Sequence, residues 1–198
     1  MSGHPASMRT SPATALGGES AEGADARASA PRFEDVYEQH MDYVWRVARR
    51  LGMAGADLDD VVQDVFVAVH RRLGDFQGRS SLRTWLYGIA IRVVRDRRRR
   101  DRRKPSTPLG DQELPGHGAD PERQAQSAEQ QRLLLALLDT LDHDKREIFV
   151  LTELEELSAP QIAEILELNL NTVYARLRAA RREFDRALTR MRARGVTP

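Results

Sequence analysis

Apolar residues recur every three or four positions along most of the chain, and this spacing constrains its fold more than any other feature. The pattern runs through residues 33–51, 61–73 and 82–94, and returns through residues 133–188. Such spacing puts apolar side chains on one face of a helix, whereas a half-buried strand needs strict alternation. We find no alternating segment of strand length and no internal repeat. The chain is therefore predicted to be all-α.

A stretch rich in proline and glycine divides this helical pattern into two halves. Residues 105–126 contain most of these interruptions, and residues 105–131 carry five acidic side chains against one arginine, a net charge of −4. Proline and glycine at this density interrupt regular elements. We predict two small helical domains, residues 32–104 and 127–194, joined by a flexible linker over 105–126. The acidic linker should avoid DNA.

The first 31 residues are nearly all alanine, serine, glycine, proline and threonine with a few charges. A segment of this composition buries too little apolar surface to offset the entropy of ordering it. We predict a disordered tail.

Capping residues set the expected ends of the helices. Gly52 is a plausible stop for the first helix, Asp57 can cap the second, and Ser80 or Ser81 can cap the third. Ser127 with Gln130 fits a capping box at the start of the second domain.

The composition argues against several classes of protein. There is no cysteine, the five histidines lack ligand spacing, and no phosphate-binding loop or catalytic triad is present. No apolar run approaches the roughly 20 residues that cross a bilayer. We expect a cytoplasmic protein that is not an enzyme and needs no metal or cofactor.

The densest charge lies in residues 92–104, where nine of thirteen residues are basic and two are acidic. Such a run attracts polyanions and releases counterions from phosphates. Arg92, Arg95 and Arg99 would share one helical face. A merely solvated charged face is the alternative.

The loop just upstream combines polar groups with aromatic rings. Gly74 and Gly78 bracket Phe76, and Trp85 follows in the next helix. Unpaired bases stack on aromatic side chains and offer their edges to polar ones, so this loop could hold single-stranded DNA. Phe76 and Trp85 could equally be ordinary core aromatics.

Residues 158–184 read as two helices and a tight turn. Ser158 with Gln161 forms a capping box, Pro160 sits in the first turn, and Asn169 can cap the second helix. Residues 173–194 carry eight arginines and two acids. A helix-turn-helix that reads the major groove fits this pattern, with a purely structural helical hairpin as the alternative.

In that second helix, the residues expected to face inward are Leu170, Val173 and Leu177. The side chains left to read base edges are Asn171, Thr172, Tyr174, Ala175, Arg178 and Arg181.

Acidic residues crowd the start of the second helix, at Asp57, Asp59, Asp60 and Asp64. The helix dipole stabilises acids there, which explains them as well as a protein-binding face does.

Three segments, in order, resemble three regions of the extracytoplasmic-function sigma factors of bacterial RNA polymerase. They are DLDDVVQDVFVAVHRRL, SSLRTWLYGIAIRVVRDRRRR and QIAEILELNLNTVYARLRAARR. The resemblance covers about 140 residues and implies a promoter-recognition subunit that binds core RNA polymerase and promoter DNA, with an anti-sigma factor as a further expected partner. A stand-alone helix-turn-helix regulator is the runner-up, and an RNA-binding protein is a third possibility.

The resemblance also implies roles for particular residues. Those expected to face the clamp of the largest polymerase subunit are Asp57, Asp59, Asp60, Gln63, Asp64 and Phe66. Those expected at the minus-10 element are Phe76, Gln77, Gly78, Arg79, Ser80, Ser81, Trp85, Arg92 and Arg95. Those expected at the minus-35 element are Asn171, Thr172, Tyr174, Ala175, Arg176, Arg178 and Arg181.

Two positions depart from the family pattern. Glu167 stands where the family's turn usually has glycine, so the backbone there should be strained or altered. Leu141-Asp142 replaces a family Leu-Pro.

Overall fold

The computed structural model describes residues 31–102 and 121–195, and every regular element within these ranges is helical. The all-α prediction is confirmed. The predicted tail, apart from residue 31, and most of the predicted linker lie outside the described residues.

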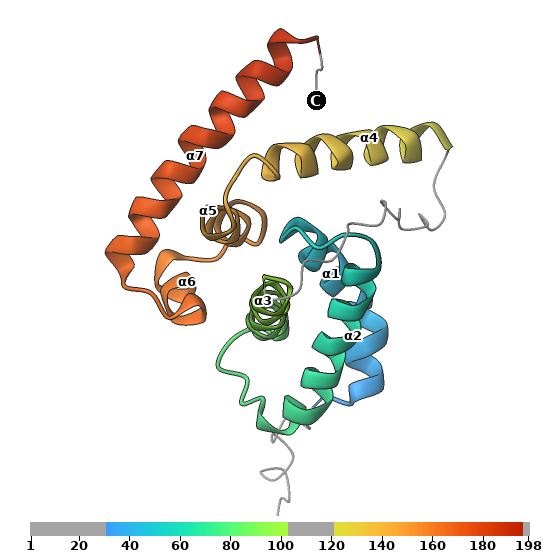
Figure 1. The fold of residues 1–198 in the computed structure, drawn as a ribbon. Helices are drawn as coiled ribbons and strands as arrows, with labels where there is room; N and C mark the ends of the chain where they lie inside the picture. The colour runs from blue at the N-terminus through green and yellow to red at the C-terminus, as the bar shows by residue number, and fades with distance from the viewer. Residues whose placement is uncertain (1–30, 103–120, 196–198) are drawn as a thin grey trace, which may run out of the picture.

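The first module consists of three helices that pack around one apolar core (Figure 1). They are α1 (Phe33–Arg50), α2 (Gly55–Arg72) and α3 (Leu82–Asp101), with a short 3-10 turn, Leu73–Asp75, after α2. The apolar stripes expected from the sequence supply this core. Its fully buried side chains include Val44, Val47, Val61, Val65, Leu86 and Val94.

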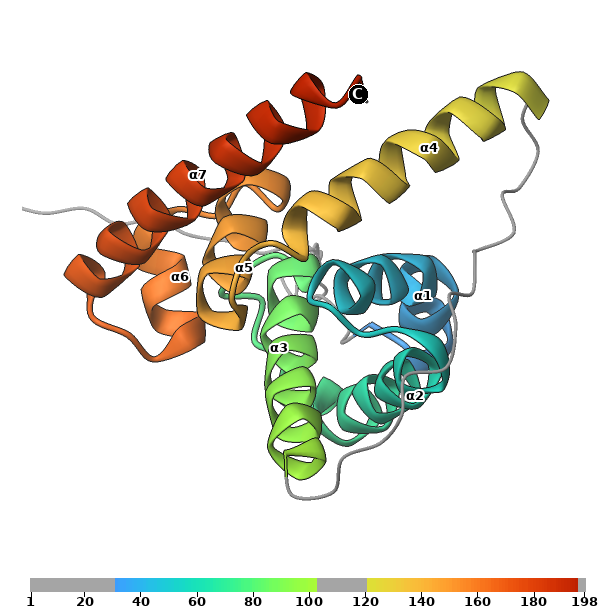
Figure 2. The same ribbon diagram turned by 45° about the horizontal axis from the view of Figure 1, so that its top comes forward.

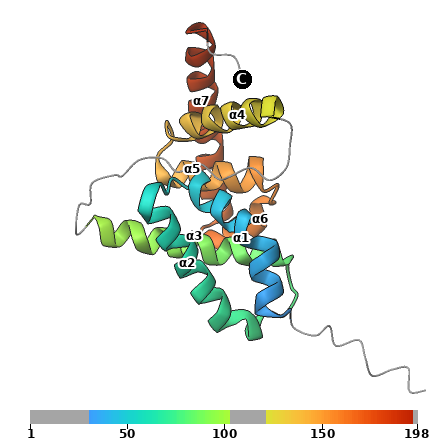
Figure 3. The same cartoon turned by 90° about the vertical axis from the view of Figure 1, so that its right-hand side faces the viewer.

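The second module begins with α4 (Pro121–Leu138) and α5 (His143–Phe149), which runs into a π-helical segment, Val150–Leu154. The helices α6 (Ala159–Leu166) and α7 (Leu170–Ala193) follow. α7 packs against α5 and α6 and then extends away from the first module (Figure 3). Phe149 and Phe184 stack where α5 meets α7, with ring centroids 4.4 Å apart.

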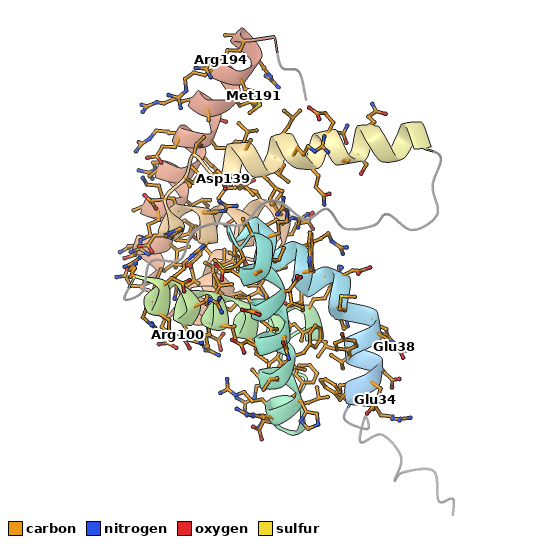
Figure 4. All side chains as sticks on the ribbon, turned by 45° about the vertical axis from the view of Figure 1, so that its right-hand side comes forward. Glu34, Glu38, Arg100, Asp139, Met191 and Arg194 are labelled. Atoms are coloured by element: carbon orange, nitrogen blue, oxygen red, sulfur yellow. The ribbon has the colours of Figure 1, made fainter. Side chains whose placement is uncertain are left out.

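The two modules pack against each other. α3 lies between α1 and α2 on one side and α5 and α6 on the other (Figure 2), and buried apolar residues of both modules form one continuous cluster. Asp139, where α4 leads into α5, lies close to this junction, while Met191 and Arg194 lie at the distant end of α7 (Figure 4). The packing places the arginine-rich helix next to the helix-turn-helix module.

Several predicted helix ends are confirmed. The Ser81 side chain accepts a hydrogen bond from the Thr84 amide at the start of α3, and Asn169 caps α7 in the same way through Thr172. Ser158 and Gln161 form the predicted capping box. These caps were predictable because each depends on contacts only three residues apart.

Two predicted helix starts are wrong. α2 begins at Gly55 after Ala54, so Asp57 lies in its first turn rather than at the cap. α4 begins at Pro121, six residues before Ser127, so the predicted capping box lies inside a helix and part of the predicted linker is helical. Proline is tolerated in the first turn of a helix, where its missing N–H costs no hydrogen bond.

The turn between α6 and α7 has a strained rather than an altered backbone at Glu167, one of the two outcomes predicted there. Glu167 adopts the left-handed conformation, with φ +56° and ψ +43°. Its amide still caps α6 by donating to the carbonyls of Ala163 and Glu164. The turn therefore keeps the geometry for which glycine is the usual residue.

Candidate nucleic-acid interface

The acidic side chains of α2 divide between two surfaces. Arg97 of α3 pairs with Asp57 and, at 3.3 Å, with Asp60, and Arg100 lies 3.9 Å from Asp64. These three acids therefore join α2 to the basic helix of their own module. Their side chains are 39% to 57% exposed, so a partner could still reach them.

Asp59 and Gln63 lie on another face of α2, away from α3, beside an apolar groove of about 710 Å³ between α1 and α2. Phe66 is buried beneath this groove, and its ring packs edge-on against the ring of Tyr37, with the centroids 4.8 Å apart. Tyr37 and Val67 are both more than two-fifths exposed at its rim. Three of the six predicted polymerase-binding residues, Asp59, Gln63 and Phe66, thus line an apolar surface that the sequence alone did not indicate.

The loop predicted to hold an unpaired base does place its aromatic ring beside α3. The rings of Phe76 and Trp85 are 5.4 Å apart between centroids. Gly78 has a φ of +67°, with open space around it. The other predicted residues of the loop, Gln77, Arg79, Ser80 and Ser81, are exposed.

Two of the three arginines predicted to share a DNA-binding face of α3, Arg92 and Arg95, point instead at the second module, whereas Arg99 pairs with Asp96 of its own helix. Arg95 donates two hydrogen bonds to Glu147, at 3.0 and 2.6 Å, and Arg98 donates a third at 3.1 Å. Arg92 lies 3.7 Å from Glu167. The side chain of Glu147 is only 2% exposed, so burial strengthens this interaction. In this arrangement Arg95 is not available to phosphates.

A second set of contacts at the same junction was not predicted. Glu155 accepts hydrogen bonds from Tyr43 at 2.9 Å and from Arg50 at 3.0 Å, both on α1. Arg146 of α5 donates to the carbonyl of Arg50 at 2.5 Å. Burial, followed by the nearby Glu155 carboxylate, raises the pKa of Tyr43 well above its usual value. The tyrosine therefore acts only as a neutral donor.

Positive charge accumulates around the start of α5. Burial lowers the pKa of Arg98, and the attraction of Glu147 only partly offsets this effect. Burial and then Arg98 lower the pKa of His143, which keeps this imidazole neutral near neutral pH. Among the described residues, Glu147 is thus the one buried carboxylate that offsets the positive charge of this junction.

The predicted recognition helix presents part of its expected face. Asn171, Tyr174, Ala175 and Arg178 are exposed on the first half of α7, and Tyr174 is 49% exposed. Thr172 is half-buried, and its hydroxyl donates to the Asn169 cap.

Three further residues of α7 differ from expectation. Arg176 pairs with Asp144 at 2.8 Å, and Arg181 pairs with Glu153 at 2.6 Å, so both are held against their own module. Leu170 was expected to face inward but is 40% exposed, because the core begins only at Val173. The first residue of a helix often lies beyond the surface that the next turn buries.

Comparison with known proteins decides the family. Residues 36–104 match the family model for Sigma-70 region 2, and residues 131–184 match the model for Sigma-70, region 4. The chain is 34% identical over 164 residues to the RNA polymerase sigma factor CnrH of Cupriavidus metallidurans, covering 79% of this chain and 86% of the relative. The chain belongs to the extracytoplasmic-function group of the sigma-70 family. This sigma factor is a non-catalytic initiation factor that directs promoter recognition by RNA polymerase.

Other relatives agree with this assignment. The sigma factor is 33% identical over 138 residues to the ECF RNA polymerase sigma-E factor of Escherichia coli, covering 65% of this chain and 72% of that one. It resembles the solved structure of CnrH in complex with the cytosolic domain of CnrY, with 27% identity, a TM-score of 0.56, and coverage of 79% and 87%. The RpoE structure from Bartonella quintana, solved with the anti-sigma factor NepR, shares the fold at 19% identity and a TM-score of 0.61, covering 79% of this chain and 96% of RpoE.

In the described part of the sigma factor, no helix combines the length and the apolar character needed to cross a membrane. No group of three or more potential metal ligands occurs among the same residues.

Proposed function

We propose that this sigma factor divides promoter recognition between its modules, with α7 reading duplex minus-35 DNA and the first module holding opened minus-10 DNA. The observation that carries the proposal is the exposed row formed by Asn171, Tyr174, Ala175 and Arg178. These residues follow a capped helix start and have no ion pair or side-chain hydrogen bond with other described residues. The N-terminal half of a recognition helix is where base edges are read.

For the minus-10 element, we propose that an unpaired base stacks against the Phe76 and Trp85 pair. Gln77, Arg79 and Ser80 would offer hydrogen bonds to its edge, since all three are exposed beside the rings. Base stacking on an aromatic ring is worth about 1–3 kcal/mol.

For core polymerase, we propose that the clamp of the largest subunit contacts the groove between α1 and α2. Asp59 and Gln63 supply polar contacts at its edge, and Tyr37 and Val67 supply exposed apolar surface. An apolar centre with a polar rim is typical of protein interfaces. Phe66 would act through packing, because it is only 4% exposed.

Binding of DNA by α3 requires the two modules to separate, because Glu147 occupies Arg95 and Arg98 in this arrangement. We propose that an anti-sigma factor favours the packed arrangement in the cytoplasm. The Bartonella RpoE, which shares this fold, was solved with the anti-sigma factor NepR, and CnrH was solved with the cytosolic domain of CnrY.

The test is reconstituted transcription with purified core polymerase. Asp59→Lys should lower core binding and promoter-specific transcription at least tenfold, because it places a cation at the proposed contact. Asp35→Lys makes the same charge change on an exposed position of α1 outside the groove, and should leave both activities intact. Equal losses in the two variants, or none in either, would contradict the proposed polymerase contact.

A further inference from the structure

A second cavity, of about 520 Å³, lies between the two modules. One wall comes from the loop and α3 of the first module, and the other comes from Gln161, Glu164 and Ile165 of α6. The cavity therefore exists only while the modules are packed together.

The floor of this cavity is a glycine inside a helix. Gly88 lies in the middle of α3 and is buried, yet a Cβ atom added there would meet nothing within 4 Å. Glycine in a helix interior is destabilising relative to alanine, so its presence is not explained by the helix itself. The missing side chain leaves open space between Trp85 and Arg92, the residues three before and four after it on the same helical face.

The side chains around the cavity match the parts of a nucleotide. Trp85 offers an aromatic surface for a base, and Arg72, Arg79 and Arg92 are three cations at the same cavity. Arg72 and Arg79 form no ion pair within the described ranges, and Arg92 has only an exposed contact at 3.7 Å with Glu167. Guanidinium groups bind phosphates, often through two hydrogen bonds at once.

Two carboxylates also line the cavity, Asp75 and Glu164. Carboxylates accept hydrogen bonds from the amino groups of bases and repel phosphates. They would therefore favour a base that carries an exocyclic amino group, such as guanine, over uracil, which has none.

We propose that this cavity binds a free nucleoside triphosphate, with its base on Trp85 and its phosphates on the arginines. Because α6 forms one wall, the bound nucleotide stabilises the packed arrangement of the modules. A promoter base would enter the same loop only after α6 withdraws, so the two ligands compete. This function goes beyond promoter recognition, and its test does not depend on transcription.

The experiment is a fluorescence titration of the full chain carrying Trp45→Phe, which leaves Trp85 as the only tryptophan. GTP should quench this fluorescence saturably. UTP, guanosine alone and tripolyphosphate alone should each bind at least tenfold more weakly, because each lacks part of the proposed contacts. Absence of saturable quenching at millimolar GTP would overturn the proposal.

Variants distinguish this site from nonspecific binding. Gly88→Ala fills the floor and should weaken GTP binding at least tenfold while keeping or raising the melting temperature. Arg72→Ala should weaken GTP binding at least fivefold. Arg71→Ala removes the neighbouring arginine, which lines the groove between α1 and α2 instead, and should leave GTP binding unchanged. Equal effects of the two arginine variants would overturn the phosphate assignment.

The wall from the second module needs its own test. Ile165→Ala should weaken GTP binding, and GTP should reduce the affinity of the full chain for single-stranded minus-10 DNA, because the two ligands compete. If Ile165→Ala binds GTP as tightly as the parent chain, the site belongs to the first module alone and the stabilising role is overturned.

Discussion

Removing the carboxylate of Glu147 should destabilise the packing of the two modules more than any other single charge change. Glu147 is buried and accepts hydrogen bonds from Arg95 and Arg98, and Arg98 is itself 9% exposed. Removing one partner of a buried ion pair costs about 3–5 kcal/mol, because the remaining charge stays buried. Arg95 is 31% exposed at its side chain and can turn to water, so its share is small. We expect Glu147→Ala to cost about 3 kcal/mol, the lower end of that range.

The assay is urea denaturation followed by circular dichroism, with small-angle X-ray scattering at zero denaturant. Glu147→Ala should lower the free energy of unfolding and increase the radius of gyration, because the modules separate. Glu38→Gln is the matched control. It alters an exposed carboxylate of α1 with no partner among the described residues, and should change neither quantity (Figure 4).

A double variant tests the physical reason directly. In Glu147→Leu with Arg98→Met, neither charge of the main buried pair remains, and such replacements are often neutral or stabilising. The carbonyl of Leu51 loses its hydrogen bond from Arg98, so recovery should be partial. We expect the double variant to be at least about 1 kcal/mol more stable than Glu147→Ala. A loss below about 0.5 kcal/mol in Glu147→Ala, as for an exposed pair, would refute the reasoning.

Three further predictions follow from single residues. In competitive duplex binding, Arg178→Ala should reduce the preference for a minus-35 sequence by about 1–3 kcal/mol, while Arg190→Ala, far along α7, should weaken binding to all sequences alike. An unchanged preference in Arg178→Ala would place the recognition face elsewhere. Folding lowers the pKa of His143, so its neutral form stabilises the folded state fully above about pH 6.5, and this stability is lost as the pH falls. Between pH 7.5 and 5.5 the melting temperature should therefore fall less in His143→Gln than in the parent chain. Glu167→Gly should raise the free energy of unfolding by about 0.5 kcal/mol by relieving the strain of the left-handed backbone, whereas Glu164→Gly inside α6 should lower it by about 1 kcal/mol. If both variants change the free energy of unfolding in the same direction, Glu167 is not strained.

The sequence predicted what depends on neighbouring residues. The caps at Ser81 and Asn169 and the turn at Glu167 were predictable because each is decided within one helical turn. Ser127 failed because a serine can cap a helix wherever it occurs, whereas this helix begins earlier, at Pro121, a residue that the first turn of a helix accepts.

The packing of the modules could not be predicted in the same way. Glu147 meets Arg95 across 52 positions, and Glu155 meets Tyr43 across 112. No local pattern reports such pairs, because both partners are ordinary surface residues by type. The arginine run was therefore interpreted as a DNA-binding face, although Arg95 and Arg98 are held within the protein.

The π-helical segment Val150–Leu154 gives the junction an unusual sensitivity to chain length. A π turn contains about one residue more than an α turn, and each residue of an α-helix rotates the following side chain by about 100°. Deleting one residue there would let α5 continue as a regular helix, but it would turn Glu155 away from Tyr43 and Arg50. A one-residue deletion would thus release the first module while the fold of the second survives, a change in helix phase rather than in charge.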